Sequence, residues 1–223
     1  LRLVAWSVAA LIDLATPRVA ASRLARVPFQ PNHLTERFGT FIIIALGETV
    51  VATAAGTEHL DWLHLVTLLA MFTVVCGLWW VYFSFGPDAI QSALEETKTR
   101  IDLIRPVLSY GHLALIAGII TVAAGIGRAI ADPAEPLTTD GAILLFGGTA
   151  LYLATFAFTR WRLFHTIALP RLSATVVVLA LFLLATQVWA LVSVLLLAVT
   201  LVILNVIESR VLPRTLRRHS STT

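Results

Sequence analysis

Long apolar runs alternate with short polar segments along most of this 223-residue chain. A helix needs about 20 apolar residues to cross the hydrocarbon core of a bilayer. Residues 172–207 carry no charge, and at about 1.5 Å per residue they would form one helix of roughly 54 Å, which is too long for a single crossing. We therefore expect two helices there, joined by a tight turn near 187–193. With the further runs at 3–16, 38–56, 62–85, 106–130 and 142–158, the pattern predicts an all-α polytopic transmembrane helix bundle of about seven spans.

Basic residues lie on alternate sides of these predicted spans. Fourteen of the 16 Lys and Arg residues fall in 17–37, 86–105, 159–171 and the C-terminal tail. Loops rich in Lys and Arg stay in the cytoplasm, so the C-terminus is expected there and the start of the chain outside. Seven spans fit this orientation, whereas six would put the basic tail outside. We interpret 1–210 as a single transmembrane helical domain that is part of a longer chain, and 211–223 as a basic cytoplasmic tail.

The composition agrees with a membrane protein rather than a soluble one. Hydrophobic residues make up 58% of the chain and charged residues 13%, about half the charged share of a typical soluble domain. The chain is basic, with a pI of about 9.6, but its basic residues are spread between apolar runs instead of gathering on one face. We therefore expect the lipid bilayer as the partner and no nucleic acid.

Small residues recur at helical spacing in the fourth and fifth predicted spans. Ala114 and Gly118 stand four apart in the fourth span, and Gly147 and Gly148 lie within the fifth. Small side chains at this spacing let transmembrane helices approach closely. We expect these two spans to lie in the interior of the bundle.

Glu48 is the single charged residue within 38–56. It follows Arg37 by 11 residues, or roughly 16 Å of helix, which puts it near the midplane of a core about 30 Å thick. An ionisable group at that depth is costly and is usually functional or paired. The residue therefore indicates a proton or cation site. The alternative is a neutral or hydrogen-bonded carboxyl that fixes helix packing.

Asp13 and His112 are the other candidates for such a site. Each stands about 7–9 Å inside the predicted cytoplasmic boundary by helix rise. Carboxylates and histidine are the usual parts of proton relays, so with Glu48 they could form a polar path from the cytoplasm to the midplane. Solvation at the interface explains both residues equally well. Asn205 and Glu208 are expected to close the last span by capping and interface solvation.

The segment that contains Glu48 carries a recognisable motif. Residues 33–49 read HLTERFGTFIIIALGET. This resembles the His-x-x-Glu-Arg-x-Gly…Leu-Gly-Glu-Ser/Thr signature of the bacterial low temperature requirement A (LtrA) family. The resemblance marks five residues besides Glu48 as the motif at the start of this helix, namely His33, Glu36, Arg37, Gly39 and Gly47.

The resemblance extends over most of residues 1–210. It is supported by Leu-Trp-Trp-Val-Tyr-Phe at 78–83 and by Tyr-Gly-His at 110–112. Family members often have an acidic residue where Ser84 stands here, so no role for that acid is carried over. The resemblance implies a multi-pass protein of the bacterial plasma (inner) membrane with further spans before this segment. The family is named for growth in the cold, which gives no reaction.

Other kinds of site find little support in the sequence. His59 and His64 are five apart, a spacing that does not face one side of a helix, so no metal site is expected. A retinal protein needs a buried lysine, and Lys98, the one lysine in the chain, falls in a predicted cytoplasmic loop. The chain has no Gly-x-Ser-x-Gly elbow, and no Gly-rich phosphate loop follows a strand. We expect no cofactor and no catalytic residue.

Three functions remain open. The first is proton-linked transport of an unknown ion or small solute, with Glu48 as the titrating group. The second is a non-catalytic membrane protein that supports growth or membrane adaptation at low temperature. The third, an intramembrane enzyme, needs a second catalytic group at the depth of Glu48, and Asp13 and His112 are both shallower. An oligomer or missing N-terminal spans would be the protein partners.

Overall fold

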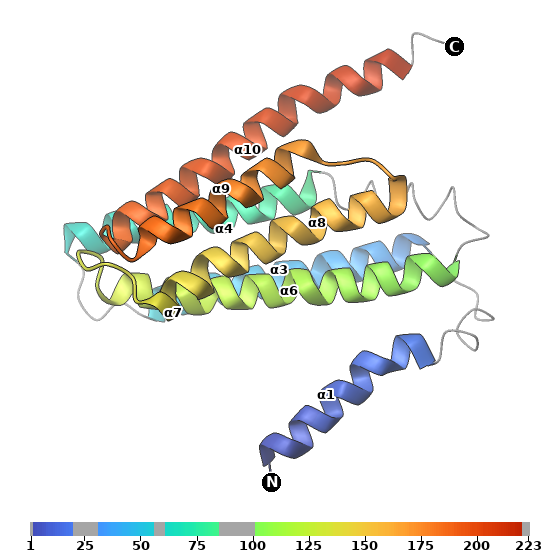
Figure 1. The fold of residues 1–223 in the computed structure, drawn as a ribbon, viewed down its shortest axis with the longest axis horizontal. Helices are drawn as coiled ribbons and strands as arrows, with labels where there is room; N and C mark the ends of the chain where they lie inside the picture. The colour runs from blue at the N-terminus through green and yellow to red at the C-terminus, as the bar shows by residue number, and fades with distance from the viewer. Residues whose placement is uncertain (1, 20–30, 56–60, 85–100, 220–223) are drawn as a thin grey trace.

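The computed structural model describes residues 2–19, 31–55, 61–84 and 101–219 (Figure 1). Every regular element in these described residues is a helix. The elements in chain order are α1 (Arg2–Val19), α3 (Pro31–Ala55), α4 (Trp62–Phe83), α6 (Ile101–Ala131), α7 (Thr139–Ala142), the π-helix η1 (Ile143–Gly147), α8 (Gly148–Phe164), α9 (Leu169–Ala185) and α10 (Ala190–His219).

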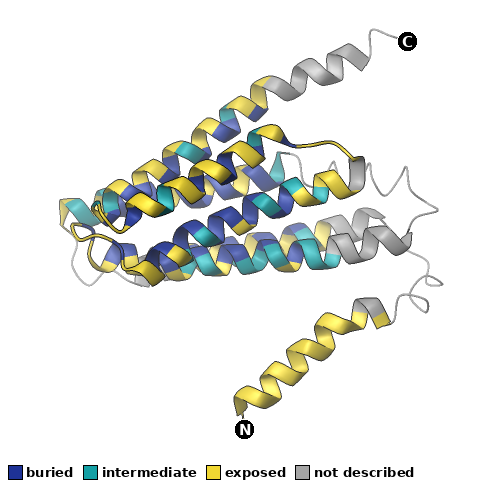
Figure 2. Cartoon of the chain, in the orientation of Figure 1, coloured by how far each residue is buried: buried dark blue, intermediate teal, exposed yellow. Residues whose placement is uncertain are grey.

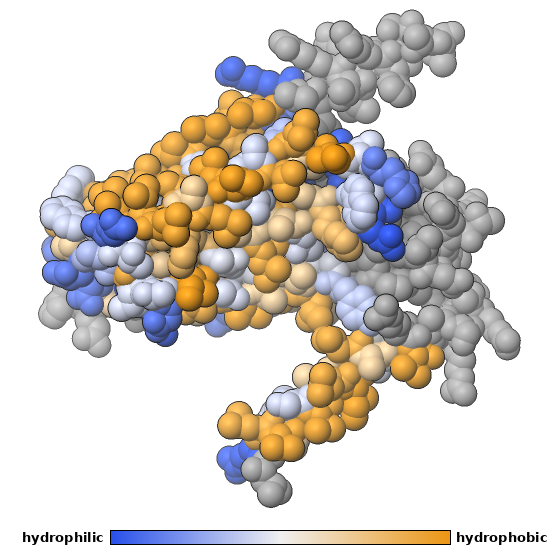
Figure 3. Space-filling model, viewed as in Figure 1, coloured by the Kyte–Doolittle hydropathy of each residue, from blue (hydrophilic) through white to orange (hydrophobic). Residues whose placement is uncertain are grey.

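The helices confirm the predicted all-α bundle. Because α7, η1 and α8 follow one another without a break, the described residues form seven rods, one for each predicted apolar run. Four segments are long and apolar enough to cross a membrane, namely Trp62–Phe83, Ser109–Ala131, Thr139–Arg162 and Ala190–Arg210. Leu169–Ala185 is apolar but shorter. The number of membrane crossings therefore stays a prediction. Figure 3 shows apolar residues over much of the visible face of the bundle.

The split within the charge-free stretch 172–207 is confirmed, and the turn falls at 186–189, slightly before the predicted position. No Pro or Gly breaks the chain there. The exposed backbone groups are instead satisfied by the preceding outer loop: the N–H of Ala190 donates to the carbonyl of Glu135 at 2.8 Å, and the N–H of Leu191 to that of Pro133 at 3.0 Å. These bonds replace the partners that the first turn of a helix lacks, so α10 can start without a capping side chain.

Helices α6 and α8 cross at very close range, as their small residues predict. A Cβ added to Gly118 would lie 2.9 Å from the carbonyl oxygen of Gly148, and one added to Gly125 would lie 2.5 Å from the backbone nitrogen of Leu145. Gly125 therefore faces the backbone of η1, where the helix widens locally. Figure 2 shows α8 as buried over its first half and increasingly exposed toward its C-terminal end. The close approach expected of these two helices is confirmed. Their interior position holds for Thr139–Arg162, which has the largest buried share of the four long apolar segments, whereas Ser109–Ala131 is no more buried than Ala190–Arg210.

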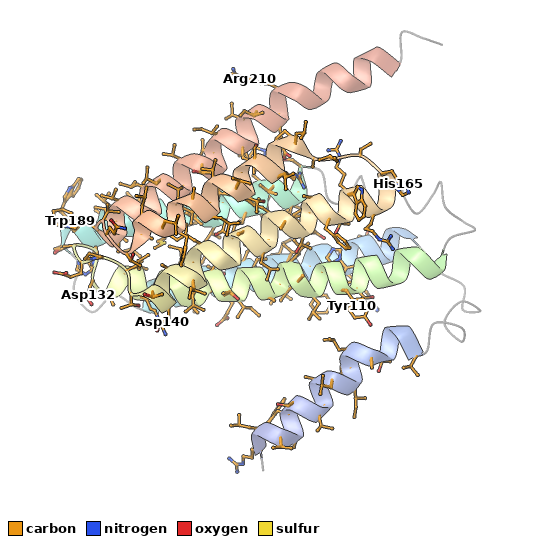
Figure 4. The ribbon with its side chains drawn as sticks, viewed as in Figure 1. Tyr110, Asp132, Asp140, His165, Trp189 and Arg210 are labelled. Atoms are coloured by element: carbon orange, nitrogen blue, oxygen red, sulfur yellow. The ribbon has the colours of Figure 1, made fainter. Side chains whose placement is uncertain are left out.

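Several helices begin or end at one end of the bundle. The C-termini of α4 and α8 and the N-terminus of α9 lie toward the right of Figure 1, as does the N-terminus of α6. The opposite end holds the turn between α9 and α10 with Asp132, Asp140 and Trp189, whereas His165 marks the first end (Figure 4). The charge pattern of the loops predicts that the first end is cytoplasmic, and it is called the cytoplasmic end below.

Candidate functional site

Five buried polar side chains lie near the cytoplasmic end, and they are called the cytoplasmic cluster. They come from four helices, and each is at most 4% exposed. Polar groups inside a bundle of transmembrane helices are costly unless they find partners. Two ionisable partners and three hydrogen-bonding side chains make up the cluster: Tyr82 on α4, His112 on α6, Arg171 on α9, and Asn205 and Glu208 on α10.

Arg171 and Glu208 form a two-pronged ion pair between α9 and α10. The Nε of Arg171 donates to Oε1 of Glu208 at 2.7 Å, and its Nη2 donates to Oε2 at 3.0 Å. The same Nη2 reaches the carbonyl of Val81 on α4 at 3.4 Å, and the guanidinium carbon lies 4.6 Å from the centre of the Phe156 ring on α8. One side chain therefore ties four helices together. Its paired, multiply bonded charge meets the condition for burying an ion.

His112 forms the second pair of the cluster. Its Nε2 lies 3.0 Å from the hydroxyl oxygen of Tyr82, and its ring stacks on Phe38 of α3 with centroids 4.0 Å apart. Tyr82 in turn meets the edge of Phe156 at 5.9 Å, the ring that also lies beside Arg171. The two pairs are thus neighbours that share one aromatic ring. His112 is thus held between a hydroxyl group and an aromatic face.

Asn205 lies one helical turn before Glu208 on the same face of α10. Its amide nitrogen donates to the carbonyls of Gly77 at 3.1 Å and Leu201 at 2.9 Å. Its Oδ1 is buried and accepts no hydrogen bond from the described residues. A buried acceptor without a hydrogen-bond donor is costly. This oxygen is therefore a favourable place for a small molecule or ion that carries a hydrogen-bond donor. Helices α4 and α10 cross closely at Gly77, where an added Cβ would lie 2.9 Å from Leu201. This crossing brings the Asn205 amide within hydrogen-bonding distance of the Gly77 carbonyl.

Of the sequence-predicted candidates, the structure brings His112 into the cluster. Gly39, from the motif at the start of α3, is buried and faces the ring of Phe83 on α4, which would lie 3.7 Å from an added Cβ. Glu36 and Arg37 are exposed at the same end of α3. The side chain of His33 lies outside the described residues. The segment that holds the signature motif therefore meets the cluster through Phe38, whose ring stacks on His112.

Glu48 and Asp13 lie apart from the cluster. Glu48 and Gly47 are on an exposed face of α3, and no atom lies within 4 Å of a Cβ added to Gly47. Asp13 is on α1, whose described side chains are all exposed, as the yellow helix in Figure 2 shows. Helix α1 contacts the bundle where the hydroxyl of Tyr110 donates to the carbonyl of Leu14 at 2.6 Å. A charged side chain at the centre of a lipid-facing helix costs about 2.5–3.5 kcal/mol on insertion scales.

The sequence interpretation missed the role of Arg171 and Glu208. The sequence pattern predicted that Arg171 is a charge of a cytoplasmic loop and that Glu208 is solvated at the membrane interface. A signal was present on α10, where buried residues recur every three or four positions and the stripe runs on into the two polar residues. The stripe comprises Val194, Leu197, Ala198, Leu201, Leu204, Asn205 and Glu208.

The outer end carries charges of another kind. Asp61 caps α4 by accepting from the backbone N–H of His64 at 2.8 Å and lies 2.6 Å from its Nδ1. The hydrogen bond from this backbone N–H, aided by the ring, lowers the pKa of Asp61 below its ordinary value of 3.8. Arg128 donates to Asp140 at 2.7 Å on the surface. Within the part of the chain that the structure describes, no three His, Cys, Asp or Glu residues gather as a metal site would require.

Comparisons with known proteins agree with the motif. The pattern of the bacterial low temperature requirement A protein (LtrA) family matches residues 1–206. An uncharacterized protein of Rhizobium meliloti (strain 1021), RA0937, is 31% identical over 167 residues. That match takes in 69% of this chain and 40% of the relative, so the chain spans less than half the length of this curated protein. No solved structure matches the chain.

Proposed function

The chain belongs to the bacterial low temperature requirement A family of membrane proteins, and we propose that it takes part in proton-linked transport of an ion or small solute. The proposal places the protein in the plasma (inner) membrane as a multi-pass helix bundle. Its C-terminus would be cytoplasmic, since the loops on that side carry most of the Lys and Arg.

The cytoplasmic cluster is the observation that carries this proposal. Ionisable residues inside a transmembrane bundle are expensive and most often mark a path for protons, ions or solutes. Here an ion pair and a histidine–tyrosine pair lie beside one another and share the Phe156 ring. A core that served packing alone would be cheaper with apolar residues of similar volume.

His112 is the group that we assign to proton exchange on the cytoplasmic side. Its ordinary pKa lies near working pH, so small changes around it alter its charge. A positive charge on His112 would face the aromatic rings of Phe38 and Tyr82 and would add to that of Arg171 nearby. Glu48, near the expected midplane, is the proposed second proton or ion site. The cargo would pass between these two depths.

A flux measurement tests the proposal. Protein expressed from its natural gene is placed in liposomes that contain a pH dye, and alkali cations, inorganic phosphate and small carboxylates are added in turn. We expect at least one of these solutes to change the internal pH. The change should be lost in Glu48→Gln and reduced in His112→Gln, whereas Asp140→Asn at the outer end should match the parent. Equal flux in the parent and both variants would overturn the coupling.

A second candidate function rests on the position of Glu48. On α3 this carboxyl is exposed and lies apart from the cytoplasmic cluster, which argues against its lining a path through the described bundle. In this case the protein would be a non-catalytic membrane component that supports growth or membrane adaptation in the cold. Glu48→Gln would then leave growth at low temperature unchanged and lower only the stability of the protein. The experiment is a growth comparison with expression levels measured beside it.

A further inference from the structure

The exposed face of α3 is unlike the other exposed apolar faces of the bundle. Phe41, Ile44 and Val51 are 56%, 61% and 61% exposed, which is normal for side chains that meet lipid tails. Glu48 stands in the middle of this face, 11 residues after Arg37 and seven before the end of α3 at Ala55. By helix rise, the carboxyl is about 10 Å or more from either end of the apolar part of the helix.

A carboxyl at that depth needs a hydrogen-bonding partner, because lipid tails supply none. The described residues of α3 show why the partner would come from outside this helix: the hydroxyl of Thr49, next in sequence to Glu48, is buried on another face and donates to the carbonyl of Ala45 at 3.0 Å. Gly47 lies beside Glu48 with open space around it. A glycine next to a polar residue is the arrangement that lets a second transmembrane helix approach closely and bond to it.

We propose that this face of α3, formed by Phe41, Ile44, Gly47, Glu48 and Val51, is an interface for a further transmembrane helix of the same polypeptide. That helix presents a hydrogen-bond donor to the Glu48 carboxyl. The proposal stands apart from transport, since a packed interface is needed whether or not the protein moves a solute.

Two observations favour a helix of the same polypeptide as the occupant. The matched relative continues well beyond the aligned region, because that region makes up only 40% of its length. Helix α1 also has an exposed surface on every described side and rests on α6 through the Tyr110–Leu14 contact (Figure 4). An apolar helix that is exposed all round needs lipid or further protein around it. The length of the relative favours further protein.

Site-directed spin labels test whether the face is covered. Cys76, the one cysteine, is first changed to Ser, and single cysteines then replace Ile44, Gly47 or Val51 in protein expressed from its natural gene and placed in liposomes. Oxygen dissolves in lipid and reports exposure to it. The matched controls are Val176 on α9, which is 61% exposed, and Ile42 on α3, which is 0% exposed.

We expect labels at the three test positions to be several-fold less accessible to oxygen than the label at Val176, and similar to the label at Ile42. Accessibility equal to that at Val176 would show that the face meets lipid, and the proposal would fail. Circular dichroism of each labelled variant reports whether it is folded. Solute flux does not enter this measurement, so its outcome is separate from that of the transport test.

A photo-crosslinker at Gly47 identifies the occupant. We expect a product that keeps the mass of one polypeptide and joins α3 to a peptide outside residues 1–223. A product that joins α3 to α1 or to another part of residues 1–223 would overturn the assignment. A product of doubled mass would show that a second copy covers the face. A product joined to another protein, or to no peptide at all, would equally overturn the assignment.

Discussion

Removing the negative charge of the buried ion pair should destabilise the protein strongly. Glu208→Gln keeps the size of the side chain and one acceptor, but it leaves the Arg171 guanidinium, with a side chain 5% exposed, facing a neutral amide. Breaking a buried ion pair costs about 3–5 kcal/mol, because the remaining charge is left without compensation. Two contacts of 2.7 and 3.0 Å are lost or weakened, while the bond to Val81 and the Phe156 ring remain. We therefore expect about 3 kcal/mol, the lower end of this range.

Arg171→Met should cost as much or more, since Glu208 then loses both donors. The double variant Arg171→Met/Glu208→Leu should recover most of the loss, because replacing both partners by apolar residues of similar volume is often close to neutral. The free energy of unfolding is measured by denaturing detergent in mixed micelles, followed by circular dichroism. Arg210→Gln, an exposed charge two residues beyond Glu208, is the matched control and should stay within about 0.5 kcal/mol of the parent.

The reasoning is refuted if Glu208→Gln also stays within that margin. It is equally refuted if the losses of the two single variants simply add in the double variant. Additive losses would mean that the two side chains do not interact in the membrane, despite their short contacts.

Two further predictions concern the outer half of the bundle. Gly125→Ala places a Cβ about 2.5 Å from the backbone of Leu145 and should lower the free energy of unfolding by about 1–3 kcal/mol. Gly127→Ala is the control and should not lower it, because no atom lies within 4 Å of the added Cβ. Thermal unfolding in detergent compares the two variants. Asp61 has a lowered pKa in the folded protein, so its stabilising contribution is present above the ordinary value of 3.8 and is lost as pH falls through the lower folded value. Asp61→Asn should flatten this acid dependence in unfolding curves taken below about pH 5.

The hydrophobic pattern predicted which segments become helices because lipid-spanning helices must satisfy their backbone internally, whatever they pack against. It predicted the ends less well. Helix α6 starts at Ile101 rather than at 106, since a helix can continue past the apolar core into polar residues. The π-helix at Ile143–Gly147 had no visible sequence signal, because it depends on the close approach of another helix at Gly125.

The buried ion pair was hidden for a related reason. Arg171 and Glu208 are 37 residues apart, and each looks like an ordinary interfacial charge when taken alone. They meet because the turn at 186–189 folds α9 and α10 into a hairpin, which brings residues at similar distances from the turn side by side. The turn was expected, but its position is fixed by hydrogen bonds to the outer loop, and no local residue marks these contacts.

The two ends of the bundle are held together by different chemistry, and this bears on where a functional movement would start. At the outer end, backbone groups of Pro133 and Glu135 bind the start of α10, and backbone hydrogen bonds do not titrate. At the cytoplasmic end, α4, α9 and α10 are joined by side chains whose bonds depend on charge, above all Arg171 and Glu208. A proton or anion that reached these groups would weaken that end and leave the outer end intact. We therefore expect any proton-linked opening of the bundle to begin at the cytoplasmic cluster, with the outer turn as its fixed point.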